Sequence, residues 1–153
     1  MTIILGLPLN IPEVPGGILD HQAAATASEV DRIQRAWANA GQAGQARIAM
    51  ISDLCFIGIF GIGSFLGGLK LSRLGVGLLR FIGIVAVISA VLFVVTDYTE
   101  TISQFIQLSA MRGDDSLAGL AATVRPIKIV AFLVTFFAVL LGLILKRRVR
   151  PTA

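Results

Sequence analysis

Hydrophobic residues fill three long stretches of the chain, and polar residues interrupt them at only a few positions. The stretches run over residues 48–69, 78–96 and 126–145. Each is close to the ~20 residues that an α-helix needs to cross the hydrocarbon core of a bilayer. The pattern therefore predicts an all-α fold, a bundle of three transmembrane helices within residues 48–146, followed by a basic tail over residues 147–153.

Residues 1–47 carry a different pattern, in which a turn-rich tail precedes an amphipathic stretch. Over residues 21–40, the apolar side chains of Val30, Ile33 and Trp37 recur at steps of three and four. This spacing places them on one face of a helix. The sequence therefore predicts an N-terminal amphipathic helix.

The start of this helix has two candidate capping boxes. In each, a hydroxyl residue precedes an acidic residue by three positions, the spacing that lets the two side chains satisfy free backbone N–H groups. The pairs are Thr26 with Glu29 and Ser28 with Asp31.

The apolar face of the amphipathic helix has two interpretations, which do not exclude each other. Trp37 with the nearby Arg32 and Arg35 is typical of an interfacial helix that lies on the bilayer surface. Alternatively, the apolar face packs on the transmembrane bundle.

The connection between the second and third apolar stretches also favours helix. Residues 101–111 keep a helical pattern, so the second helix is expected to continue beyond the bilayer. Asp114 or Asp115 is then suited to cap a short extramembrane helix over residues 116–124. Pro126 would open the third membrane helix, because proline is tolerated in a first turn.

Composition supports the membrane class. Of the 153 residues, 56% are apolar and only 14% are charged, whereas soluble domains carry about 25% charge. The net charge of +4 does not indicate nucleic-acid binding, because the basic residues form no patch interleaved with aromatic ones. With one cysteine, Cys55, an intrachain disulfide is excluded.

Charge also predicts the orientation in the membrane. Alternation of three spans puts the N-terminal region and residues 97–125 on one side. The loop 70–80 and the carboxyl tail, on the other side, hold seven basic residues and no acidic one. Since cytoplasmic loops are rich in Lys and Arg, the carboxyl terminus is expected in the cytoplasm and the amino terminus outside.

Four charged residues are expected to meet at the outer ends of the three spans, because chain alternation brings those ends to one membrane side. We expect Gln104 to join this polar cluster, whose charged members are Asp53, Asp97, Glu100 and Lys128. Charges at the membrane boundary require partners or water.

Small residues recur on the same helical stripes as these charges. They let membrane helices approach closely, and Gly63 with Gly67 forms a GxxxG pair. The predicted helix-packing positions are Gly61, Gly63, Gly67, Gly68, Gly83, Ala90 and Gly142.

The cluster has a structural and a functional interpretation. In the first, Lys128 bridges the carboxylates and locks the bundle. In the second, the excess of acids holds a proton, a cation or an amine-bearing ligand. No nucleophile–base pair indicates an enzyme. His21, alone and expected in a loop, does not indicate a metal site.

The order of these motifs resembles a family of small, uncharacterised bacterial integral membrane proteins. The resemblance spans about residues 15–145, with Thr101 where the family pattern has asparagine. It implies no known activity. The motifs are Pro15-Gly16-Gly17-Ile18-Leu19, Ile33 with Trp37, Asp53 with Phe56, Asp97-Tyr98-Thr99-Glu100, and Lys128.

Two functions follow from these patterns. The first is a non-enzymatic accessory or assembly subunit of the bacterial inner membrane, whose partners are the lipid bilayer and other membrane protein subunits. The alternative is a small carrier or lipid-handling protein that uses the acidic cluster to bind a proton, cation or headgroup. The sequence identifies no cofactor.

Overall fold

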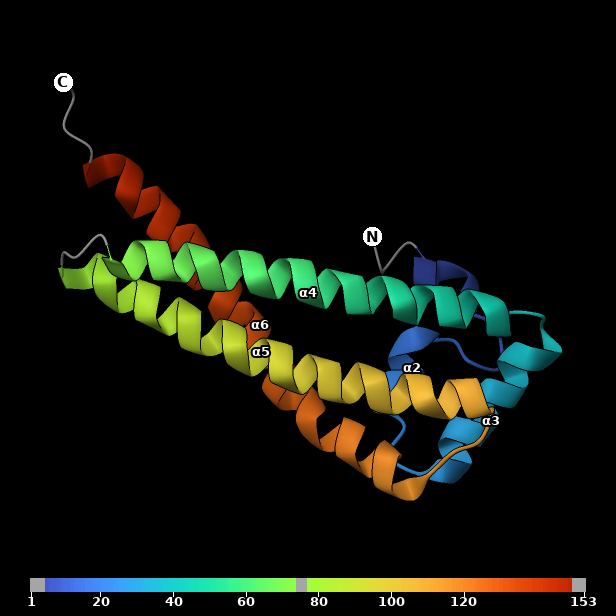
Figure 1. Cartoon of the computed structure of the whole chain (residues 1–153). Coiled ribbons are helices and arrows are strands. Elements are labelled where there is room, and N and C mark those ends of the chain that lie inside the picture. Colours follow the sequence, from blue (N-terminus) through green and yellow to red (C-terminus); the bar gives the residue numbers. More distant parts are fainter. Residues whose placement is uncertain (1–4, 74–76, 150–153) are drawn as a thin grey trace. The chain divides into compact units, whose positions relative to one another are not determined.

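The chain folds almost entirely into helices. A computed structural model describes residues 5–73 and 77–149 (Figure 1). Within these ranges the only β-type pairing is one isolated bridge between Ile11 and Val14. The helices are the short 3-10 helix η1 (Leu7–Leu9), α2 (Ile18–Ala23), α3 (Ala27–Asn39), α4 (Ala43–Arg73), α5 (Gly77–Ala110) and α6 (Asp115–Val149).

Three of these helices are long and apolar enough to cross a membrane. They are α4, α5 and, within α6, Asp115–Lys146. The predicted all-α fold with three apolar helices is therefore confirmed. The second helix also extends past the predicted apolar stretch to Ala110, as its pattern indicated.

A short helix followed by a separate third membrane helix was expected, but the structure has a single helix, α6, over both segments. Instead of opening a new helix, Pro126 lies inside α6. A proline lacks the N–H that would bond to the carbonyl four residues earlier. Long apolar helices tolerate this loss, because neighbouring groups and small backbone adjustments satisfy the freed carbonyl.

The chain divides into two compact units. Unit 1 consists of Met1–Ile57 and Thr96–Pro126, and unit 2 consists of Gly58–Val95 and Ile127–Ala153. Each long helix therefore contributes one part to unit 1 and another to unit 2.

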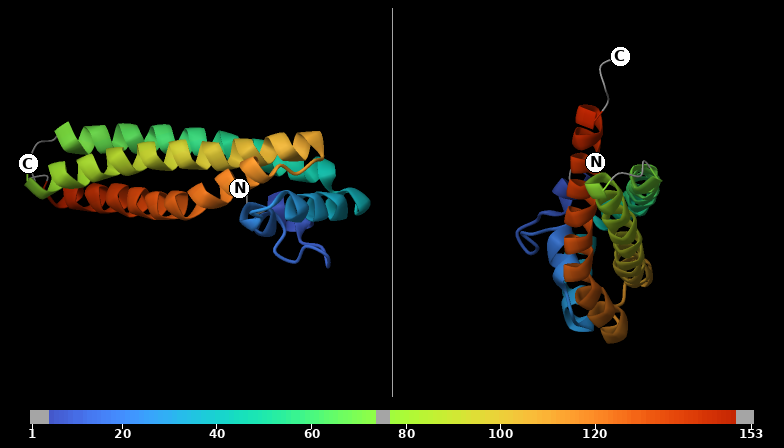
Figure 2. Two further views of the ribbon diagram at one scale, coloured as in Figure 1. Left: turned by 90° about the horizontal axis from the view of Figure 1, so that it is seen from below. Right: turned by 90° about the vertical axis from the view of Figure 1, so that its left-hand side faces the viewer.

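The core of unit 1 is built around the N-terminal segment, which turns back on itself (Figure 2). Val30, Ile33 and Trp37 of α3 are all buried in this core, together with Leu9 and Leu108. The indole Nε1 of Trp37 donates a hydrogen bond to the carbonyl of Leu9 at 3.0 Å. The apolar face of α3 is thus packed inside unit 1, which is the second of the two interpretations of its pattern.

Helix α3 begins with the first of the two candidate capping boxes. The Thr26 hydroxyl accepts from the backbone N–H of Glu29 at 3.3 Å, and the Glu29 carboxylate accepts from the N–H of Ala25 at 3.1 Å. These bonds satisfy N–H groups that the first turn leaves free.

The turn between α5 and α6 is fastened to α3. Asp114 caps α6 by accepting from the N–H of Leu117 at 3.0 Å. Asp115 instead accepts from the N–H of Ala27 at 2.7 Å. Gly113 lies against the backbone of Ala27, where there is no room for a Cβ. The two predicted capping aspartates therefore serve different helices.

Unit 2 is a three-helix packing of apolar side chains. Phe60, Phe93 and Phe132, one from each long helix, have ring centroids 5.0 to 5.6 Å apart. The hydroxyl of Thr135 donates to that of Ser89 at 2.9 Å, which links α6 to α5. Both polar groups are thereby satisfied inside an apolar environment.

Candidate functional site

A stripe of polar side chains runs along the part of α5 that belongs to unit 1. Asp97 is 5% exposed, Glu100 0%, Gln104 2% and Gln107 1%. Their spacing of three and four residues places them on one face of the helix. Burial of so many polar groups on one face is costly unless they are hydrogen-bonded. This stripe is therefore the candidate site in unit 1.

Several hydrogen bonds hold the stripe. The Gln104 amide donates to the Glu100 carboxylate at 3.4 Å. The Gln107 amide donates to the carbonyl of Ser103 at 3.1 Å. Its oxygen accepts from the N–H of Asp114 at 3.0 Å, at the start of α6. The stripe therefore connects α5 to the α5–α6 turn.

A second contact ties the region of Asp97 to α4. The hydroxyl of Tyr98, the residue after Asp97, donates to the carbonyl of Leu54 at 3.2 Å. Asp53, the neighbour of Leu54, is partly exposed and also belongs to unit 1. Four of the five predicted cluster members thus lie in unit 1.

Lys128, the fifth predicted member, is partly exposed and lies in unit 2. Its pairing with the carboxylates stays a prediction. Among the described residues, no three His, Cys, Asp or Glu side chains are grouped so that they hold a metal ion.

The polar stripe continues into a network that the sequence patterns did not indicate. The Gln34 amide of α3, in the orientation that satisfies its neighbours, donates to the carbonyl of Gln107 at 3.3 Å and accepts from the N–H of Leu108 at 3.1 Å. The same amide lies 3.3 Å from Nε2 of His21. Helices α2, α3 and α5 therefore share one buried polar network.

The expectation that His21 lies in a loop is wrong. His21 lies in α2 and is fully buried. Its ring lies 5.2 Å from that of Trp37. Its Nδ1 has no hydrogen-bonding partner. Burial lowers the pKa of His21 to about 4, because desolvation disfavours the charged imidazolium. The imidazole is therefore neutral near pH 7. The amphipathic spacing of α3 gave no signal for this histidine, because it lies on a different helix.

Four of the predicted helix-packing glycines fall into two groups. A Cβ on Gly68 would lie 2.9 Å from the backbone N of Val87, and one on Gly83 would lie 2.8 Å from the backbone O of Gly68. Helices α4 and α5 thus touch backbone to backbone at Gly68 and Gly83. Gly61 and Gly142 lie against side chains, those of Val94 and of Leu71 respectively.

The GxxxG pair, Gly63 and Gly67, belongs to neither group. No atom lies within 4 Å of a Cβ placed on Gly63, and only Val139, at 3.9 Å, lies near one placed on Gly67. Ala90, in contrast, is fully buried. The close contact of α4 within unit 2 therefore uses Gly61 and Gly68 and leaves Gly63 open.

The fold defines the class of the protein, an integral membrane protein with three candidate membrane-spanning helices. No family model, curated protein or solved structure matches the chain.

Proposed function

We propose that the chain is an accessory or assembly subunit that packs against a larger membrane complex, in the bacterial inner membrane. The observation that carries this proposal is the open glycine Gly63, on an exposed face of a candidate membrane-spanning helix. The resemblance of its motifs to small bacterial membrane proteins supports the bacterial membrane location in this proposal and implies no activity.

An open glycine in a membrane helix favours a helical partner over lipid. Glycine costs about 1 kcal/mol of helix stability relative to alanine. In other membrane proteins this cost is offset where a second helix approaches closely. No atom of another residue lies within 4 Å of a Cβ placed on Gly63, and Ile59, one turn away, is 76% exposed. We therefore assign the Ile59–Gly63 face of α4 to a helix of another subunit.

The polar stripe supports a structural role for the predicted charge cluster. Glu100 and Gln104 bond to each other, and Gln107 bonds to the start of α6. These contacts fix α5 within unit 1. In the proposal, Asp53, Asp97, Glu100 and Lys128 complete this framework, and the docking face on α4 is the functional surface.

Native purification tests the proposal. The tagged full-length chain is extracted in a mild detergent, and its partners are identified and quantified by mass spectrometry. We expect stoichiometric recovery of a larger membrane complex. Recovery of only a solitary monomer or homo-oligomer would contradict the accessory role.

A pair of glycine variants localises the interaction. Gly63→Leu adds bulk to the proposed docking face, and Gly119→Leu adds the same bulk at a second helical glycine with open space around it. Gly63→Leu should release the partner, whereas Gly119→Leu should retain it. If both variants recover the same amount of partner, the partner does not bind the Ile59–Gly63 face.

A second candidate function rests on the burial of two carboxylates. Asp97 and Glu100 are 5% and 0% exposed. In membrane proteins, buried carboxylates of this kind often bind protons or cations as part of the protein's function. A carrier or lipid-handling role predicts that Asp97→Asn with Glu100→Gln abolishes transport while the protein still accumulates. Loss of the protein from the membrane would instead support the structural role.

A further inference from the structure

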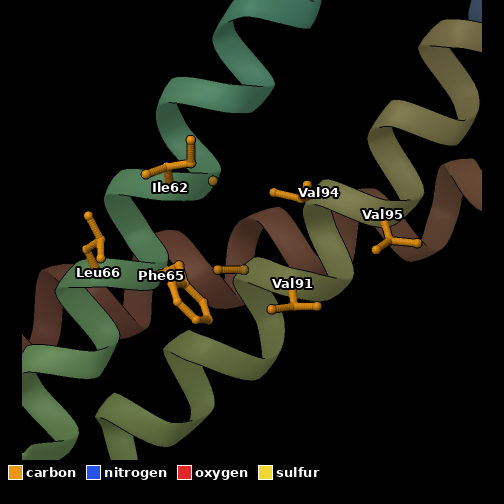
Figure 3. A pocket seen from close by; sticks show the side chains of 8 residues that line it. Ile62, Phe65, Leu66, Val91, Val94 and Val95 are labelled. Atoms are coloured by element: carbon orange, nitrogen blue, oxygen red, sulfur yellow. The ribbon is translucent and has the colours of Figure 1, made fainter.

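Unit 2 contains an apolar groove on the surface of the α4–α5 pair. The groove has a volume of about 240 Å³. Figure 3 shows Phe65 extending between the two helices, with Ile62 and Leu66 on α4 and Val91 and Val95 on α5 along the groove. Four of these side chains, all except Phe65, are strongly exposed.

Glycine packing explains why the groove exists. The backbones of α4 and α5 touch at Gly68 and Gly83. Gly61 and Ala90, further along the two helices, contribute almost no side-chain volume to the groove. The small residues therefore leave a hollow between the larger side chains that flank it.

The rows of side chains that line the groove continue to two arginines. On α4, Arg73 follows Leu66 by seven residues, which returns it to nearly the same face of the helix. On α5, Arg80 precedes Val91 by eleven residues, which again returns it to the same face. Both arginines are exposed. One cation from each helix therefore lies beyond the same end of the groove.

The distances suit a molecule that is charged at one end and apolar at the other. The seven residues from Leu66 to Arg73 span about 10 Å of helix, and the eleven from Arg80 to Val91 span about 16 Å. One leaflet of the hydrocarbon core is about 15 Å thick. A lipid whose headgroup lies at the arginines thus reaches the groove with an acyl chain.

The basic residues of unit 2 indicate that the lipid headgroup is anionic. The sequence of unit 2 contains eight basic residues and no acidic residue. Lys70, Arg73 and Arg80 lie at the end of α4 and the start of α5. Clusters of this kind next to a membrane helix attract anionic lipids, and arginine binds phosphate oxygens in a bidentate manner.

We propose that unit 2 binds one anionic phospholipid, with its phosphate at Arg73 and Arg80 and an acyl chain in the groove lined by Ile62, Leu66 and Val91. The site borders the proposed docking face, because Leu66 of the groove follows Ile59 by seven residues and so returns to nearly the same face of α4. The lipid is a bound component of the subunit and not a substrate.

Native mass spectrometry of the full-length chain tests the site. The delipidated protein in detergent is titrated with phosphatidylglycerol or, separately, with phosphatidylcholine of the same acyl chains. We expect one phosphatidylglycerol to bind about thirtyfold more tightly than phosphatidylcholine, since each basic residue at a membrane surface contributes about a kcal/mol. Equal binding of the two lipids overturns the proposal.

Matched charge variants locate the headgroup. Arg73→Gln with Arg80→Gln should reduce phosphatidylglycerol binding to the phosphatidylcholine level. Arg112→Gln with Arg125→Gln removes the same charge from unit 1 and should leave the preference intact. Arg73→Lys with Arg80→Lys should retain most of it, which excludes misfolding as the cause of a loss. A preference that survives the glutamine pair at 73 and 80 overturns the headgroup assignment.

A second matched pair locates the acyl chain. Val91→Trp fills the groove, whereas Ile88→Trp adds a large ring at an exposed position of α5 that does not line the groove. Val91→Trp should weaken phosphatidylglycerol binding, and Ile88→Trp should not. Equal effects of the two variants overturn the assignment of the groove.

Discussion

The imidazole of His21 lies 5.2 Å from the indole of Trp37, centroid to centroid, and neither side chain is exposed to solvent. The two residues come from different helices, α2 and α3, so their contact reports on the packing of the N-terminal segment. Because Trp37 is the only tryptophan of the chain, tryptophan fluorescence reports on the surroundings of Trp37, which include His21.

Acid is expected to destabilise unit 1 through His21. Its pKa is about 4 in the folded protein and 6.5 for the unperturbed group, so the unfolded state binds more protons between these values. The stability contribution is complete above pH 6.5, falls as the pH drops from 6.5 to 4, and stays lost below that. The full loss is about 3 kcal/mol.

Denaturant unfolding followed by tryptophan fluorescence at pH 7 and at pH 4 measures this effect. The free energy of unfolding of the wild type should fall more between these pH values than that of His21→Gln, which stays neutral. An equal fall in the two proteins would show that other groups cause it.

The contact between Gly68 and Gly83 predicts a second stability difference. Gly83→Ala would place a methyl group 2.8 Å from the backbone O of Gly68, an overpacking that should cost about 1–3 kcal/mol. Gly63→Ala, at an open position, should be neutral or slightly stabilising. Thermal unfolding of the two variants in detergent measures the difference, and equal melting temperatures would contradict the backbone contact.

The sequence was sufficient to predict the long helices and their main features. The apolar stretches predicted α4, α5 and α6, because only a helix satisfies every backbone group over such a length in an apolar environment. The capping-box spacing identified Thr26 and Glu29, since it acts over a few residues. In each case the signal lay within one local segment of the chain.

Two other features were not predicted correctly from the sequence. His21, Gln34 and Gln107 lie on three different helices, and no spacing relates them, so their shared network emerges only from tertiary packing. Pro126 was expected to begin a helix and lies inside one, because long apolar helices tolerate the loss of one backbone hydrogen bond. The pairing of Lys128 with the carboxylates stays a prediction, because it too depends on how distant segments of the chain pack.

A double-mutant cycle tests the predicted pairing of Asp97 with Lys128. If the two side chains pair within the predicted cluster, Asp97→Asn and Lys128→Gln should each destabilise the protein, because each removes one member of a charge pair at the partly exposed Lys128. The double variant should then be less destabilised than the sum of the two. Unfolding in mixed micelles measures the three values, and strict additivity would contradict the pairing.

Cysteine labelling tests the predicted orientation. In a Cys55→Ser background, Ser116→Cys places an exposed thiol at the start of α6, and Arg73→Cys places one at the end of α4. A membrane-impermeant maleimide should label Ser116→Cys in intact cells and Arg73→Cys only after lysis. The opposite labelling would place the amino terminus in the cytoplasm.

Photo-cross-linking in cells tests whether the Gly63 face of α4 binds a helix of another membrane protein. A photoreactive amino acid is placed at Gly63 and, in a separate variant, at Ile88, which is 63% exposed on α5. The position-63 variant should form one discrete cross-link to the protein recovered by native purification, and the position-88 variant should not. Equal cross-linking at both positions, or cross-linking at neither, would show that the Gly63 face does not bind a partner helix.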